Sequence, residues 1–235
     1  FDLNSSIIRL DMSEYMEKHS LSKIIGAPPG YIGFESGGQL TEAVRKNPYS
    51  LILLDEIEKA HKDILDILLQ VLDDGIITDG QGRTISFKNS IIVLTSNLGS
   101  QSINDLSIRN EDANEIKNIV DFELKKFFKP EFLNRLDEIV IFKNLELDEL
   151  KKIANIQLKN LENRLIKKDL NLQITDEVIN QLVQDSFDSN YGARPLKRII
   201  QKEIETKIAN NILNNNYLNK KEVSISIKDG GIFVD

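Results

Sequence analysis

The chain has 235 residues, of which 40% are hydrophobic and 29% charged, enough to form one large packed domain or two unequal ones. The net charge of −7 argues against binding nucleic acid through its phosphates, which needs clustered, uncompensated Lys and Arg. With no Cys and only two His, thiol chemistry and Cys-ligated metals are excluded, and any metal is expected on oxygen ligands. No apolar run approaches the roughly 20 residues of a membrane-spanning helix.

The first part of the chain, to about residue 142, alternates short apolar runs with amphipathic helical patterns, which predicts an α/β fold with a parallel sheet. Helices are predicted over residues 38–47 and 61–73, the second ending at Gly75. Residues 76–87 are predicted to form a hairpin or a long loop. The predicted strands, each a continuous apolar run typical of strands covered on both faces, are residues 7–10, 51–54, 91–95 and 139–142.

The character of the sequence changes after Phe142, where helical patterns rich in Leu and Lys begin. We therefore place a domain boundary near residue 144, which gives an α/β domain over 1–143 and a small, mostly helical α+β domain over 144–235. The predicted helices of the second domain are residues 147–165, 176–184 and 195–213, and its two short strands are residues 170–174 and 222–227.

Two carboxylates, Asp55 and Glu56, directly follow the apolar run at residues 51–54. Open α/β sheets bind ligands at the carboxyl ends of their strands. In a nucleotide hydrolase the first carboxylate would orient hydrated Mg²⁺ on the phosphates and the second would polarise the attacking water. The alternative is that the two acids only begin a solvated loop or cap the next helix.

Asn97 follows the next predicted strand, so its amide is expected at the same sheet edge, where it can position water against a γ-phosphate. An Asn in an ordinary turn is the alternative. Tyr31 lies between glycines behind Pro28 and Pro29, which indicates a defined loop that projects an aromatic side chain. An exposed aromatic there would grip another chain, whereas a buried one would be a hydrophobic staple.

Two arginines have sequence contexts that suit an anion. Arg135 either pairs internally with Asp137 or Glu138 or projects to a phosphate on a neighbouring subunit, as arginine fingers do. Arg194 precedes Pro195 at a predicted helix start, where a helix N-terminus and a cation together favour an anion, although the segment is also an ordinary cap.

These motifs occur in the order and spacing of one family. The sequence resembles the second ATPase domain of the Clp-type AAA+ protein unfoldases, most closely the ClpB disaggregase branch, over essentially the whole chain. The segments that carry the resemblance are residues 11–15, 26–38, 51–60, 72–82, 95–99, 130–138 and 191–197.

The resemblance implies that the chain binds ATP and Mg²⁺ and that the second domain is the lid of the nucleotide site. It implies that Asp55 and Glu56 are the Walker B pair, with Asp55 holding Mg²⁺ through water and Glu56 activating water. The other implied site residues are Asn97 as sensor 1, Arg135 as an arginine finger acting in trans, Arg194 as sensor 2, Tyr31 and Ile32 in the substrate-contacting pore loop, and residues 79–83 as a second pore loop.

The sequence departs from the family at one point, because the Gly-x-x-x-x-Gly-Lys-Thr phosphate loop is not found in these residues. That loop supplies most of the phosphate-binding energy, so we expect the chain alone neither to hydrolyse ATP nor to bind it more tightly than about 1 mM. The first, central strand of the AAA+ sheet would be missing as well. We therefore expect either a break in the sheet between residues 91–95 and 139–142 or an exchange of strands between molecules.

The main functional hypothesis is part of a hexameric, ATP-driven chaperone that threads unfolded or aggregated polypeptides through a central pore, with a DnaK-type chaperone as a possible partner. The alternative is a ClpC-type ATPase that feeds a ClpP-type peptidase, but residues 98–114 lack the aliphatic-Gly-Phe tripeptide that usually docks the peptidase. An ATPase-dead scaffold and a DNA-acting AAA+ relative are disfavoured by the complete polar set and by the acidic charge. We expect no nucleic acid or membrane partner and a location in the cytoplasm or in a mitochondrial or plastid-like matrix.

Overall fold

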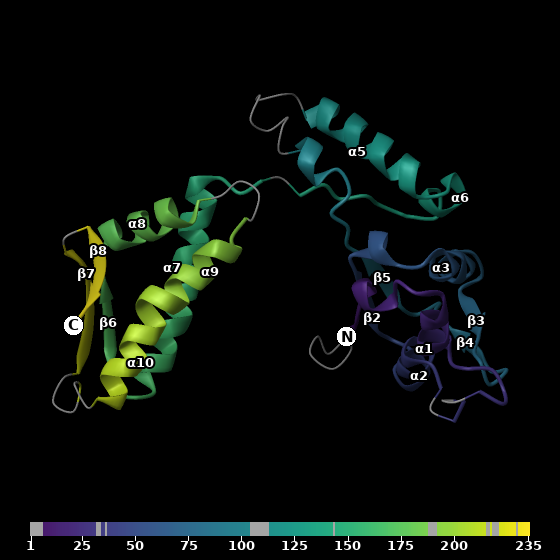
Figure 1. Cartoon of the computed structure of the whole chain (residues 1–235), viewed down its shortest axis with the longest axis horizontal. Coiled ribbons are helices and arrows are strands. Elements are labelled where there is room, and N and C mark those ends of the chain that lie inside the picture. The colour runs from purple at the N-terminus through teal and green to yellow at the C-terminus, as the bar shows by residue number, and fades with distance from the viewer. Residues whose placement is uncertain are drawn as a thin grey trace. The chain divides into compact units, whose positions relative to one another are not determined.

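The computed structural model describes residues 7–31, 34–35, 37–103, 113–142, 144–187, 192–214, 217, 221–228 and 230–235. The chain forms two compact units, Phe1–Ile141 and Phe142–Asp235. Figure 1 labels their helices and strands.

The first unit is built on a parallel sheet of β1 (Ile7–Asp11), β2 (Leu51–Asp55) and β5 (Ile91–Leu94), in the order β1-β2-β5. Figure 1 labels β2 and β5. Ile8 lies opposite Ile52, which lies opposite Ile92, and the register continues to the pair Asp11 and Asp55. The mixed α/β class and the three strands are confirmed. Because the strands are parallel, their polar ends share one edge of the sheet.

Helices and a hairpin connect these strands. The predicted helices are confirmed as α2 (Gln39–Lys46) and α3 (Lys62–Asp74), and α3 ends at Gly75 in the left-handed conformation that glycine adopts freely. The predicted hairpin is confirmed as antiparallel β3 (Ile76–Thr78) and β4 (Thr84–Ser86). The sequence patterns did not reveal α1 (Leu21–Ile25), α5 (Ala113–Phe127), α6 (Pro130–Leu133) or the short 3₁₀ turns at Met12–Tyr15, Lys18–Ser20 and Ile57–Lys59.

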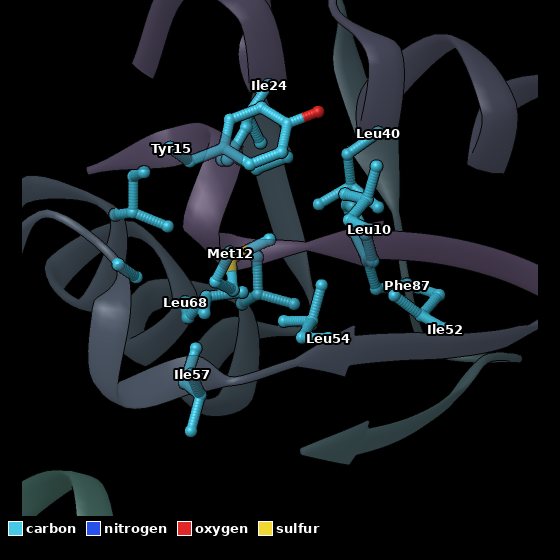
Figure 2. Packing of buried hydrophobic residues seen from close by; sticks show 14 of the residues in the cluster. Leu10, Met12, Tyr15, Ile24, Leu40, Ile52, Leu54, Ile57, Leu68 and Phe87 are labelled. Carbon is cyan, nitrogen blue, oxygen red and sulfur yellow. The ribbon is translucent and has the colours of Figure 1, made fainter. Parts of the chain in front are cut away.

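The core of the first unit forms where the sheet meets these helices. Figure 2 shows the buried side chains of Leu10, Ile52 and Leu54 from the strands gathered with Ile57 and Leu68. Tyr15 buries its ring in the same cluster and donates its hydroxyl to Gln39 Oε1, so its one polar atom is satisfied. The close-packed side chains of β2 fix the position of the residues that follow it.

The prediction of a strand at residues 139–142 is wrong. These residues have no strand structure, and Phe142 at their end is 86% exposed. Within the described part of the chain, β5 pairs only with β2, so no neighbour offers the backbone groups that would make an extended segment here a strand. Among the described residues the sheet ends at β5, which is less covered than its apolar run predicted, and the choice between a broken sheet and an exchange of strands stays a prediction.

The second unit packs α-helices and a π-helical stretch beside a small sheet. Helix α7 (Leu147–Ile166) and helix α8 (Asp176–Ser186) match the predictions closely. The helix predicted over residues 195–213 is α9 (Arg194–Ile199), a π-helical stretch at Ile200–Glu205 and α10 (Thr206–Leu213). The sheet order is β6-β7-β8, in which β6 (Asn171–Ile174) and β7 (Glu222–Lys228) are confirmed and β8 (Gly231–Val234) was not predicted.

None of the described helices combines the length and the apolar character needed to cross a membrane.

The uneven cover of the sheet leads to a prediction about two isoleucines on neighbouring strands. Ile52 is 1% exposed and Ile91 is 52% exposed. Ile52→Ala should lower the free energy of unfolding by about 2–5 kcal/mol because it leaves a cavity. Ile91→Ala, the matched control, should cost less than about 1 kcal/mol. Chemical denaturation of the two variants measures both values, and equal losses would contradict the exposed position of β5.

Candidate functional site

The carboxyl edge of the parallel sheet carries a cluster of polar side chains centred on Asp55, the last residue of β2. Asp55 Oδ2 lies 2.5 Å from Arg9 Nη2 on the neighbouring strand, and Asp55 Oδ1 accepts a hydrogen bond from the Thr95 hydroxyl at the end of β5. The carboxylate is therefore held from both sides: Arg9 lies on β1 opposite Leu53, and Thr95 directly follows Leu94, which lies opposite Leu54.

Glu56 follows in the left-handed conformation, with φ 56° and ψ 51°, which is uncommon for a residue other than glycine. Its backbone N–H donates to Thr95 Oγ1 at 3.2 Å, and its carboxylate Oε2 lies 2.6 Å from Lys59 Nζ. Hydrogen bonding to Glu56 raises the pKa of Lys59. The positive φ lies at the end of the strand, and the two adjacent acids have different ionic partners, Arg9 for Asp55 and Lys59 for Glu56.

Thr95 joins the two acids, and the sequence analysis overlooked it. One hydroxyl donates to Asp55 and accepts from the Glu56 N–H, while the Thr95 N–H donates to Leu54 O at 3.0 Å. The Thr95 carbonyl accepts from the Ile57 N–H at 3.0 Å. A hydroxyl residue one position after an apolar run was the available signal, but a hydroxyl at a strand end is common enough to pass unnoticed.

Asn97 lies at this edge with an exposed side chain, as predicted. Its backbone N–H donates to Glu58 Oε1 at 3.2 Å, which ties the segment after β5 to the 3₁₀ turn after Glu56. The other oxygen, Glu58 Oε2, is buried without a hydrogen-bond partner among the described residues. The structure thus brings Asp55, Glu56 and Asn97 together at one edge.

The acidic edge suits a magnesium ion held largely by water and phosphate oxygens. Within the described ranges, no group of three or more His, Asp or Glu side chains converges as a protein-only metal cage would require. Mg²⁺ at phosphate sites needs only one or two carboxylates, and Asp55 supplies one. Arg9, its present ionic partner, is 65% exposed and is free to turn into solvent.

Arg135 lies elsewhere in the first unit. It forms an ion pair with Asp73 near the end of α3, whereas the sequence analysis had considered Asp137 and Glu138 as partners. Helix α3 begins close after Glu56, and Asp73 lies about 17 Å further along its axis at 1.5 Å per residue. Arg135 is 55% exposed and is held at the end of α3 that is remote from Asp55.

Arg194 belongs to the second unit, where it is exposed and begins α9 ahead of Pro195, as predicted.

The loop that carries Tyr31 projects its aromatic ring into solvent. Tyr31 is 71% exposed, so the predicted exposed aromatic is confirmed and the buried staple is excluded. Backbone hydrogen bonds from Tyr31 to Pro28 O and from Phe34 to Tyr31 O form consecutive turns around it. Ile32, the other predicted contact residue, lies outside the described residues. The second predicted pore loop, residues 79–83, is the turn of the β3–β4 hairpin.

Comparison with known protein families assigns the class. Residues 1–139 match the AAA domain (Cdc48 subfamily) family, and residues 145–225 match the C-terminal, D2-small domain of ClpB protein. The chain therefore belongs to the AAA domain family, as the parallel sheet with an acidic pair at its edge indicates.

Individual relatives are ClpB chaperones. The chain is 51% identical over 232 residues to the chaperone protein ClpB of Prochlorococcus marinus, covering 99% of this chain and 27% of that protein. It is 51% identical over 233 residues to ClpB of Vibrio cholerae, with 99% and 27% covered, and 49% identical over 232 residues to the mitochondrial ClpB4 of Arabidopsis thaliana, with 97% and 24% covered. The chain thus spans about a quarter of the length of these relatives, and the resemblance to ClpB is confirmed.

The geometry of Thr95 gives a prediction that needs no nucleotide. Thr95→Val keeps the shape of the side chain but removes the hydroxyl that bridges Asp55 and the Glu56 N–H, so the Glu56 amide should exchange with solvent about tenfold faster. Thr95→Ser keeps the hydroxyl and should stay within about twofold of the parent. Hydrogen exchange of the two variants makes the comparison, and equal rates in Val and Ser variants would show that the hydroxyl does not hold Glu56.

Proposed function

We propose that this chain is the second ATPase module of a ClpB-type chaperone, in which ATP hydrolysis drives the threading of unfolded or aggregated polypeptide through the pore of a hexamer. The observation that carries the proposal is the polar edge at which the Thr95 hydroxyl bonds both the Asp55 carboxylate and the Glu56 backbone N–H. Residues 1–143 would form the large subdomain and residues 144–235 the lid.

The proposed chemistry assigns one task to each carboxylate. Mg²⁺ on the ATP phosphates would offset their charge, and Asp55 would hold its water shell, with Arg9 displaced. Glu56 would leave Lys59 and accept a proton from the water that attacks the γ-phosphate. The side-chain amide of Asn97, already at this edge, would orient that water.

Arg135 and Arg194, which lie away from the sheet edge in the sequence, would complete the nucleotide site. Arg135 is held far along α3 from its own Asp55, which supports action on the ATP of a neighbouring subunit after it leaves Asp73. Arg194 would bring a cation and a helix start to the nucleotide when the lid closes. Hydrolysis would then move the loop that carries Tyr31, together with Ile32, along the bound polypeptide.

The setting follows from the relatives. The match to the D2-small domain of ClpB supports disaggregation over delivery to a ClpP-type peptidase, and a DnaK-type chaperone is the partner we propose. The cytoplasm or an organelle matrix is the proposed location, and the mitochondrial name of one relative supports the second.

The assignment of Glu56 is tested in a chimera in which this chain replaces the matching segment of the Vibrio cholerae relative. Glu56→Gln removes the base but leaves Asp55, so ATP should stay bound while turnover at this module falls by about 10²–10⁴-fold. Glu131→Gln, an exposed acid on α6, is the matched control and should turn over ATP like the parent. Near-normal turnover of the Glu56 variant would assign the base to another residue.

The role of Tyr31 is tested in the same chimera with a fluorescent substrate protein that loses its signal when threaded. Tyr31→Ala should abolish threading, whereas Tyr31→Phe should retain most of it because the aromatic ring supplies the grip. Tyr49→Ala is the matched control, since Tyr49 is 66% exposed but lies outside the loop. Normal threading by the Tyr31→Ala chimera would remove Tyr31 from the substrate path.

A further inference from the structure

The turn of the β3–β4 hairpin is built around a buried carboxylate. Asp79 is 5% exposed, and its Oδ1 accepts from the backbone N–H groups of Gln81 at 3.0 Å and Arg83 at 2.8 Å. Its Oδ2 accepts from Arg83 Nε at 2.7 Å and lies 2.5 Å from Arg83 Nη2. A buried charge paired this completely holds both the turn and the Arg83 side chain in one geometry.

Arg83 also reaches outside the hairpin. Its Nη2 forms an ion pair with Glu42 Oε1 on α2, the helix that follows the Tyr31 loop. Glu42 Oε2 accepts in turn from Arg45 Nη2 at 2.9 Å, one turn further along α2. Glu42 is therefore shared between a partner on the hairpin and a partner on its own helix.

Glu42 contacts the end of the Tyr31 loop as well. A Cβ atom added to Gly37, which has φ 67°, would lie 2.6 Å from Glu42 Cγ and 3.0 Å from Glu42 Oε1. Only glycine leaves room for this side chain at that point while adopting a positive φ. The loop end, α2 and the hairpin thus meet at one glutamate.

The backbones of the loop and the hairpin touch directly beside this glutamate. The Gly80 N–H donates to Ile25 O at 2.9 Å, and a Cβ added to Gly80 would lie 2.5 Å from Ala27 O. At the other end of the loop, a Cβ added to Gly38 would lie 2.3 Å from Ile24 O. Three backbone segments therefore pack at distances that exclude any side chain.

One further contact reaches the part of the loop that presents the aromatic ring. Gln81 Nε2 donates to Phe34 O at 2.8 Å, and the Phe34 N–H donates to Tyr31 O at 3.2 Å. The hairpin turn consequently supports the turn that projects Tyr31.

In the sequence, the hairpin lies between the two segments that form the candidate hydrolytic site, Asp55–Glu56 and Thr95–Asn97. Along the chain, Glu56 leads through α3 into β3, and β4 leads into β5, which is followed by Thr95 and Asn97. A shift at either end of this segment would therefore act on the hairpin.

We propose that Glu42 and Arg83 are positioning residues that clasp the hairpin turn to the Tyr31 loop, so that the two loops move as one body when the hydrolytic edge changes. That this clasp helps to apply force to a polypeptide rests on the proposed function. The clasp itself rests on the contacts alone.

The charges of the clasp persist over the physiological pH range. Hydrogen bonds from Arg45 and then Arg83 lower the pKa of Glu42 from 4.5 to about 2. Because the folded value is the lower one, this stabilisation is complete above pH 4.5 and is lost as the pH falls toward 2. Burial alone would raise the pKa of Asp79, but its hydrogen bonds from Arg83 and Gln81 lower it overall, and bonding to Asp79 and then Glu42 raises the pKa of Arg83.

The clasp is tested by hydrogen exchange on the chain itself. Glu42→Gln weakens the link to Arg83, so the amides of Gly80 in the hairpin and Phe34 in the loop should exchange about tenfold faster, and by the same factor. Arg45→Gln removes the other partner of Glu42 without touching the hairpin, so both amides should stay within about twofold of the parent. The Thr95 amide, bonded within the sheet, is the internal reference.

A change at Gly80 without one at Phe34, no change at either, or an equal change at Thr95 would overturn the clasp. In the chimera, Glu42→Gln should slow threading about tenfold, with basal ATP turnover within about twofold of the parent. If the Glu42→Gln amides of Gly80 and Phe34 exchanged faster together but the chimera threaded at the parent rate, the clasp would have no role in applying force. If the Tyr31→Ala chimera also threaded normally, the proposed function would fail, while the exchange result for the clasp would stand.

Discussion

The hydroxyl of Thr95 is the contact on which the candidate site depends. It donates to Asp55 and accepts from the backbone of Glu56, two adjacent acids that the proposed chemistry needs in different orientations. The parallel register of β2 and β5 brings Thr95 level with Asp55, and the left-handed backbone of Glu56 turns its side chain toward Lys59. A single neutral hydroxyl can bridge the two because it both donates and accepts.

The site and the loops form one continuous path through the first unit. The chain runs from Glu56 through α3 and the hairpin to β5 and Thr95. The hairpin therefore belongs to the segment that connects the two parts of the site along the sequence. Buried Asp79 makes its turn rigid, and Glu42 ties that turn to the loop that exposes Tyr31. Under the proposed clasp these contacts would pass on small displacements, because packed interfaces do not deform continuously.

The sequence predicted many of the elements that depend on local pattern, although it missed α1, α5 and α6, and it missed the contacts that depend on tertiary pairing. Three strands, α2, α3, the hairpin and the exposure of Tyr31 followed from periodicity and from Gly and Pro. Residues 139–142 have strand composition, yet a strand also needs a neighbour, and the described residues provide none. Arg135 forms its ion pair with Asp73, 62 positions away by residue number, and not with the adjacent acids. The ion pair between Glu42 and Arg83 likewise joins elements whose contact no sequence spacing predicts.

The most direct test of this account is a structure of the assembled chimera with Mg²⁺ and a non-hydrolysable ATP analogue. The account predicts Asp55 at the water shell of Mg²⁺, still bonded to Thr95, and Glu56 turned from Lys59 to a water beside the γ-phosphate. It also predicts Arg135 released from Asp73 and in contact with the nucleotide of the neighbouring subunit. Glu56 still paired with Lys59, with another acid beside the γ-phosphate, would contradict it.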